Sequence, residues 1–141
     1  YRRQRQMCIR DSIKKMSAGI PLNDDDRADW LTRLGQELIS ALETHAHPVL
    51  TCSSLKRKYR ERLREAVPGL GFVFLELSRE EAAQRVGNRP GHFMPASLID
   101  SQFATLEPPH GEPATLVLDA GESIDTLGRK AADWWRAAND R

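Results

Sequence analysis

The sequence FVFLEL at residues 72–77 decides the fold, because five of its six residues are apolar and it stands between a Pro-Gly break and Ser78. An apolar run of this kind is typical of a strand covered on both faces of a parallel sheet. Two further apolar runs, at residues 49–52 and 115–119, have the same character. We therefore predict three parallel strands buried within one sheet.

Helical patterns fill the intervals between these runs. Apolar residues recur at helical spacing from Trp30 to Leu42, and we expect one of Asp24, Asp25 and Asp26 to cap that helix. Further helices are predicted at residues 55–66, after Ser78, around residues 98–106 and at residues 123–138. Strands alternating with helices predict an α/β fold, in which helices cover a parallel sheet and form a layered architecture.

Ligands of open α/β sheets lie beyond the carboxyl ends of the strands, which directs attention to the segments after Cys52, Leu77 and Asp119. Lys56 and Arg60 follow the first of these points and share one helical face, an arrangement that suits an anion. The basic run to Arg64 could also be a nucleic-acid patch or a solvated helix face, and from the residues alone the solvated face is the favoured interpretation.

Composition and charge limit the classes of function. The chain has 141 residues, 40% of them hydrophobic, which suits one domain. Its net charge of +1 divides into +3 on residues 1–12 and −2 on the remainder. A slightly acidic body argues against nucleic-acid and anionic-membrane partners. The sequence shows neither a secretory signal nor a membrane span, so we expect a cytoplasmic location.

Three stretches together resemble one family, the gluconate kinases among the small P-loop carbohydrate kinases. They are KMSAGIPLNDDDRADWL at residues 15–31, CSSLKRKYRERLR at residues 52–64, and RVGNRPGHF at residues 85–93 followed by SQFATLE at residues 101–107. The resemblance implies a three-layer P-loop kinase fold with a lid at about residues 79–107. It also implies transfer of the ATP γ-phosphoryl group to the 6-hydroxyl of D-gluconate, with Mg²⁺, and makes a homodimer plausible.

The resemblance assigns roles to individual residues, beginning with the substrate. Arg27 corresponds to an arginine that holds a substrate carboxylate, and Lys56 and Arg60 look like further substrate or phosphate ligands. His92 looks like a lid residue that shapes the hinge or touches substrate, and a hydrogen-bonded structural histidine explains that loop position equally well. Arg85 and Arg89 resemble the catalytic lid arginines that neutralise phosphate charge. The adenine is expected at the turn after the 115–119 strand, formed by Asp119, Ala120 and Gly121.

One departure from the family pattern bears on activity. No stretch of the sequence matches G-x-x-x-x-G-K-[ST], the loop that cradles phosphates and Mg²⁺. We therefore expect residues 13–141 to be the C-terminal part of a gluconate kinase that lacks the first strand, phosphate loop, first helix and second strand. Residues 1–12 are expected to be foreign or artefactual, and the chain as written to be inactive.

Two other functions remain open at this stage. A non-catalytic, regulatory domain could bind a sugar acid through Arg27, Lys56 and Arg60 without transferring a phosphoryl group. A nucleic-acid-binding module could use residues 2–10 and 56–64, although the acidic body opposes it. We expect no metal site, because the only close histidine pair, His45 and His47, stands at a helix end where histidine is ordinary.

Overall fold

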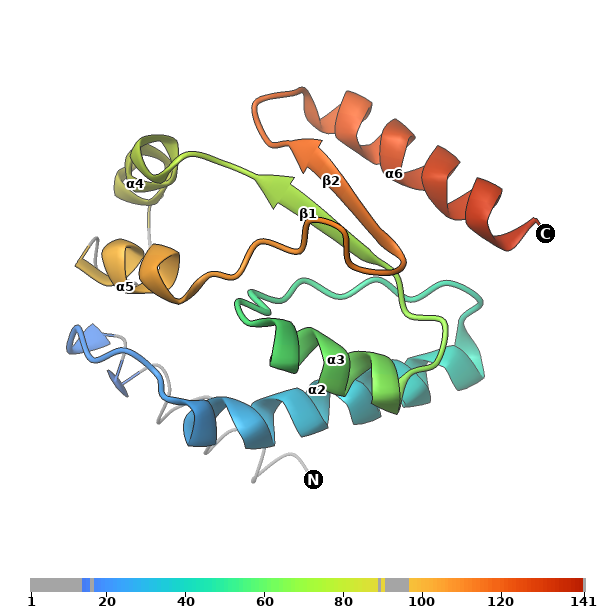
Figure 1. The fold of residues 1–141 in the computed structure, drawn as a ribbon, viewed down its shortest axis with the longest axis horizontal. Coiled ribbons are helices and arrows are strands. Elements are labelled where there is room, and N and C mark those ends of the chain that lie inside the picture. The colour runs from blue at the N-terminus through green and yellow to red at the C-terminus, as the bar shows by residue number, and fades with distance from the viewer. Residues whose placement is uncertain (1–13, 16, 89, 91–96, 141) are drawn as a thin grey trace.

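The computed structural model describes residues 14–15, 17–88, 90 and 97–140. Figure 1 shows helices arranged around a small parallel sheet, as the α/β prediction requires. In chain order the elements are α2 (Asp24–Thr44), α3 (Arg57–Ala66), β1 (Phe72–Glu76), α4 (Arg79–Gly87), α5 (Ser97–Thr105), β2 (Thr115–Asp119) and α6 (Ile124–Asn139). The segment at residues 1–12 and the predicted lid residues Arg89 and His92 lie outside the described residues.

The described sheet consists of β1 and β2, which pair in parallel from Phe72 opposite Thr115 to Glu76 opposite Asp119. Parallel neighbours need a long crossover connection, and α4 and α5 supply it. Both strands end at the same edge of the sheet. The predicted strands at residues 72–77 and 115–119 are confirmed to within one residue.

The third predicted strand, at residues 49–52, is wrong for the described structure. That segment is irregular, and the side chain of Val49 is 93% exposed. A strand satisfies its backbone groups through a neighbouring strand, and no strand lies beside these residues in the described part of the chain. For the same reason β1 is not covered on both faces, since Val73 and Leu75 are exposed.

The start of α2 corrects a second prediction. The N-cap is Asn23, not one of the three aspartates, and its side-chain oxygen accepts a hydrogen bond of 2.8 Å from the backbone N–H of Asp26. The Asp26 carboxylate accepts in return from the Asn23 N–H at 3.0 Å, which completes a capping box. Asp24 is thereby freed from capping and points elsewhere.

The core that positions the site lies between α2 and α3. Leu31 of α2 packs with Leu55, Tyr59 and Leu63, and partly buried apolar residues surround this cluster. The two helices approach closely at Gly35, where an added Cβ would lie 3.0 Å from the Ala66 Cβ. Because the helices pack along their lengths, their N-terminal ends are held near each other.

Two of the remaining helices, α4 and α6, begin at polar caps. Ser78 and Glu81 form a capping box at α4, and the Ser123 side chain accepts from the N–H of Thr126 at α6. Figure 1 shows α6 running along β2, on the other side of the sheet from α2 and α3. None of the described helices is long and apolar enough to cross a membrane.

Candidate functional site

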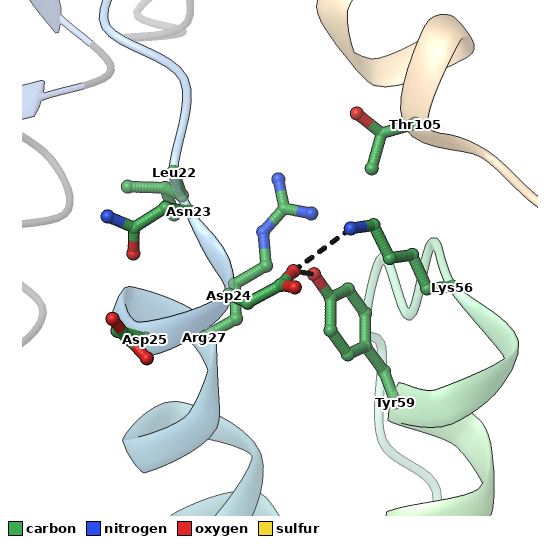
Figure 2. A pocket seen from close by; sticks show the side chains of 8 residues that line it. All are labelled: Leu22, Asn23, Asp24, Asp25, Arg27, Lys56, Tyr59 and Thr105. Carbon is green, nitrogen blue, oxygen red and sulfur yellow. Dashed lines mark hydrogen bonds and ion pairs between the residues drawn. The ribbon is translucent and has the colours of Figure 1, made fainter.

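A pocket of about 410 Å³ lies where the N-terminal ends of α2 and α3 face the end of α5 (Figure 2). Its walls come from segments far apart in the sequence, which the α2–α3 core and the α5 helix bring together. The lining residues are Leu22, Asn23, Asp24, Asp25, Arg27, Lys56, Tyr59 and Thr105. The structure therefore places two predicted substrate ligands, Arg27 and Lys56, in one pocket.

Arg27 is the buried cation of this pocket. The residue is 8% exposed, and its guanidinium carbon lies 5.6 Å from the centre of the Tyr59 ring. Figure 2 shows its guanidinium pointing into the pocket, between α2 and Thr105. Among the described residues its guanidinium makes no hydrogen bond or ion pair, whereas its backbone N–H donates to the Asn23 carbonyl oxygen at 3.2 Å. A largely buried guanidinium with unused donors is suited to bind a carboxylate or phosphate.

Asp24 faces Arg27 from the same turn of α2 and is engaged by three donors. Its carboxylate accepts from Lys58 Nζ, from the Tyr59 hydroxyl, and from Lys56 Nζ at 3.0 Å. These hydrogen bonds, that from Lys58 first, hold the pKa of Asp24 well below its usual range. The hydrogen bond to Asp24 raises the pKa of Lys56. Asp24 and Lys56 therefore both remain charged at neutral pH.

Arg60 lies outside the pocket and is committed to other partners. It is 3% exposed, and its Nη2 lies 2.6 Å from Glu112 Oε1. Its guanidinium also donates to the backbone carbonyl oxygens of Ser54, Leu55 and Glu107. In this arrangement Arg60 fixes the loop before α3 and the chain after α5. Its contact with substrate stays a prediction from the resemblance.

Two of the predicted nucleotide segments meet beyond the carboxyl end of β2. Arg85 Nη2 donates to the backbone carbonyl of Ala120 at 2.9 Å, which links α4 to the turn after β2. Within that turn, the Asp119 carboxylate accepts from the Gly121 N–H at 2.7 Å. The structure thus brings Arg85 to the segment expected to hold adenine. Arg89 and His92 lie outside the described residues and stay predictions.

Sequence reasoning missed some members of the pocket. Asp24 was expected as a cap, and Tyr59 and Thr105 were given no role, although all three lie within the stretches that carry the family resemblance. It also missed Glu107, whose carboxylate accepts from the Arg57 N–H at 2.7 Å at the start of α3. The available signal was the unbroken acidic run at Asp24, Asp25 and Asp26 beside Arg27, which is longer than one helix cap requires.

The described residues contain no group of three or more histidine, cysteine, aspartate or glutamate side chains placed to hold a metal ion. His110 instead pairs with Glu76 at 2.9 Å, and His47 meets the edge of Trp135. The histidines of this part of the chain are thus engaged in local contacts.

The known proteins that are similar in sequence to this chain belong to one family. No protein-family model matches the chain. A gluconokinase of Gluconobacter oxydans is 46% identical over 111 residues, which are 79% of this chain and 62% of that protein. The thermoresistant gluconokinase of Escherichia coli is 38% identical, over 82% of this chain and 67% of its own length. A probable gluconokinase of Xenopus tropicalis is 36% identical, over 83% and 70%.

Two solved structures share the fold. A gluconokinase from Sinorhizobium meliloti has a TM-score of 0.76 at 45% identity and matches 92% of this chain and 73% of that structure. A sugar kinase from a Janibacter species has a TM-score of 0.81 at 39% identity, over 89% and 72%. The chain spans 53–62% of the length of three of the curated relatives it matches. From these identities over most of its length, the chain belongs to the gluconokinase family.

Proposed function

We propose that the pocket between α2, α3 and α5 is the sugar-acid site of an ATP-dependent kinase that phosphorylates the 6-hydroxyl of D-gluconate. One observation carries this proposal: the Arg27 guanidinium is largely buried, points into the pocket and has no hydrogen-bonding partner among the described residues. Gluconate carries one carboxylate, which matches the planar donor fork of one arginine.

The other lining residues suit the hydroxyl groups of a sugar acid. Asp24 offers acceptor oxygens, Lys56 offers N–H donors, and Thr105 offers a hydroxyl that donates and accepts. In Figure 2 these three side chains converge on the space in front of Arg27. A carboxylate at Arg27 would therefore place the polyol chain among groups that can hydrogen-bond to it.

The nucleotide is proposed to lie at the carboxyl ends of β1 and β2. Arg85 and the Asp119–Gly121 turn lie there, and Arg89 belongs to the same proposed set of phosphate-neutralising groups from the resemblance. An arginine near the transferred phosphoryl group stabilises the negative charge that develops during transfer. We propose His92 as a lid residue near the substrate, again from the resemblance.

The printed sequence holds no phosphate loop, and this shapes what the chain itself is expected to do. ATP and Mg²⁺ are expected for the family, but the described residues offer Mg²⁺ no cluster of ligands and we assign it none. Phosphoryl transfer depends on positioning and charge neutralisation by that loop. We therefore propose that this chain binds D-gluconate without phosphorylating it. A cytoplasmic location stays a prediction from the sequence, and a homodimer stays a prediction from the resemblance.

Calorimetric titration with D-gluconate and with D-glucitol, the matching polyol without a carboxylate, tests the site. We expect saturable binding of gluconate and none of glucitol at the same concentrations. Equal binding of the two, or binding of neither, would contradict the proposed site. A coupled assay of ADP formation tests the proposal that this chain does not phosphorylate gluconate. ADP released in response to gluconate would contradict that proposal.

A further inference from the structure

The positively charged side chains around the pocket differ in whether an acidic side chain already pairs with them. Three cations, Arg27, Lys56 and Lys58, face two acidic residues, Asp24 and Asp25. Both lysines give a hydrogen bond to the same carboxylate, that of Asp24. Within the described residues, this leaves Arg27 as the pocket cation without an anionic partner.

Asp24 is held in this arrangement by more than its ion pairs. The Tyr59 hydroxyl donates to the same oxygen, Oδ1, that accepts from Lys56, and Tyr59 itself is 5% exposed and packed into the α2–α3 core. The rigid phenol fixes the carboxylate between the lysines and the pocket. Figure 2 shows Asp24 between Arg27 and the Lys56 chain, with its bonds to Tyr59 and Lys56 drawn.

We propose that Asp24 is a specificity-determining residue that limits this pocket to sugar acids with one negative charge. It occupies Lys56, so a second carboxylate on the ligand finds no free cation among the described residues of the pocket and meets the negative charge of Asp24 instead. Like charges brought together in a partly desolvated pocket disfavour binding. The inference rests on the proposed function only in taking this pocket as the sugar-acid site.

The proposal distinguishes two ligands that share one carbon skeleton. D-Gluconate has one carboxylate and D-glucarate has a carboxylate at both ends. Asp24→Asn removes the anion that neutralises Lys56 and leaves a hydrogen-bonding side chain of nearly the same size. Lys56 is then free to bind the second carboxylate of glucarate. The variant should therefore gain affinity for the dicarboxylate relative to the monocarboxylate.

The test compares gluconate and glucarate affinities for the unmodified chain, D24N and two controls. D25N removes a neighbouring acid that has no ion pair among the described residues, and Tyr59→Phe removes the hydroxyl that helps to hold Asp24 but retains the Asp24–Lys56 pair. We expect the unmodified chain to prefer gluconate by about tenfold or more, and D24N to reduce that preference by about tenfold. D25N should change it by less than about threefold, and Y59F should change it by less than D24N does.

A double variant guards against a folding artefact. Asp24 pairs with two lysines, of which Lys56 lines the pocket and Lys58 does not. D24N/K56Q lacks both the anion and the pocket-lining cation that its loss releases, so it should return the preference toward that of the unmodified chain. Thermal unfolding of every variant shows which of them are folded. An unchanged preference in D24N, an equal change in D24N and D25N, or a double variant that behaves as D24N does would overturn the proposal.

Simple anions separate this proposal from the proposed function. Acetate and malonate differ in charge as gluconate and glucarate do but carry no hydroxyl groups, and the NMR shift of the Arg27 Nε–H reports their binding. Suppose that the pocket prefers acetate over malonate, that D24N reduces this preference, and that gluconate binds no better than acetate. The sugar-acid function then fails, whereas the role of Asp24 in limiting the pocket to one negative charge is supported. If the unmodified chain binds malonate as tightly as acetate, or binds neither, the proposed role of Asp24 is contradicted.

Discussion

Arg60 of α3 and Glu112 of the loop before β2 form a buried ion pair, with 2.6 Å between Nη2 and Oε1 and side chains 3% and 5% exposed. Arg64 also donates to Glu112, at 3.0 Å. One carboxylate thus receives two guanidinium groups from successive turns of one helix. The pair ties α3, whose first turn borders the pocket, to the segment that leads into β2.

Replacing Glu112 should cost far more stability than replacing an exposed partner of another arginine. Glu112→Gln leaves Arg60 buried without a counter-charge, and we expect a loss of about 3 kcal/mol in the free energy of unfolding. Glu61→Gln breaks the exposed Arg57–Glu61 pair and should cost less than about 0.5 kcal/mol. Urea denaturation of both variants measures the difference, and similar losses would contradict a structural role for the buried pair.

Acid should weaken the same contact. The guanidinium of Arg60 lowers the pKa of Glu112 below its ordinary range. Because the folded pKa is depressed, the stabilisation is present above the unfolded glutamate pKa of about 4.3 and is lost as the pH falls through the folded value. We expect the stability of the unmodified chain to fall with pH below about 5, and less steeply in E112Q. Parallel curves for the two proteins would show that Glu112 does not contribute.

Gly71, just before β1, is a packing requirement. A Cβ at this position would lie 2.9 Å from Trp134 Cη2 and 2.9 Å from Trp135 Cζ3. Gly71→Ala should therefore force α6 away from the sheet and lower the stability by about 1–3 kcal/mol. At Gly87, where an added Cβ meets no atom within 4 Å, alanine should be neutral or slightly stabilising. Differential scanning calorimetry of the two variants checks this, and equal melting temperatures would count against the close approach.

The sequence predicts the parts of this fold that depend on neighbouring residues. The helices after Ser78 and at residues 123–138, the strands that form β1 and β2, and the α2 periodicity are all local signals, and the structure confirms them. The prediction of a strand at residues 49–52 was wrong because a strand requires a neighbouring strand to pair with, and the local sequence does not show whether one is present. An apolar run shows what would be favourable to bury, and only the fold shows what is available to cover it.

The site was predictable only as far as the family resemblance reached. The structure brings Arg27 and Lys56, two predicted substrate ligands, into one pocket, but the role of Asp24 depends on partners 32 to 35 residues away. The ion pair of Arg60 was not foreseen, because its buried partner, Glu112, lies 52 residues further along the chain. Charged residues in a pattern indicate a site, whereas long-range pairing decides which charges remain free to bind a ligand.

The central claim is that Arg27 holds the carboxylate of a sugar acid. Calorimetric titration of D-gluconate into the unmodified chain and into Arg27→Lys measures it most directly, with Arg129→Lys as a matched control at an exposed position of α6. Lysine keeps the charge but loses the planar fork, so R27K should weaken gluconate binding by about tenfold or more, and R129K should not change it. Equal affinities of R27K and the unmodified chain would contradict the account.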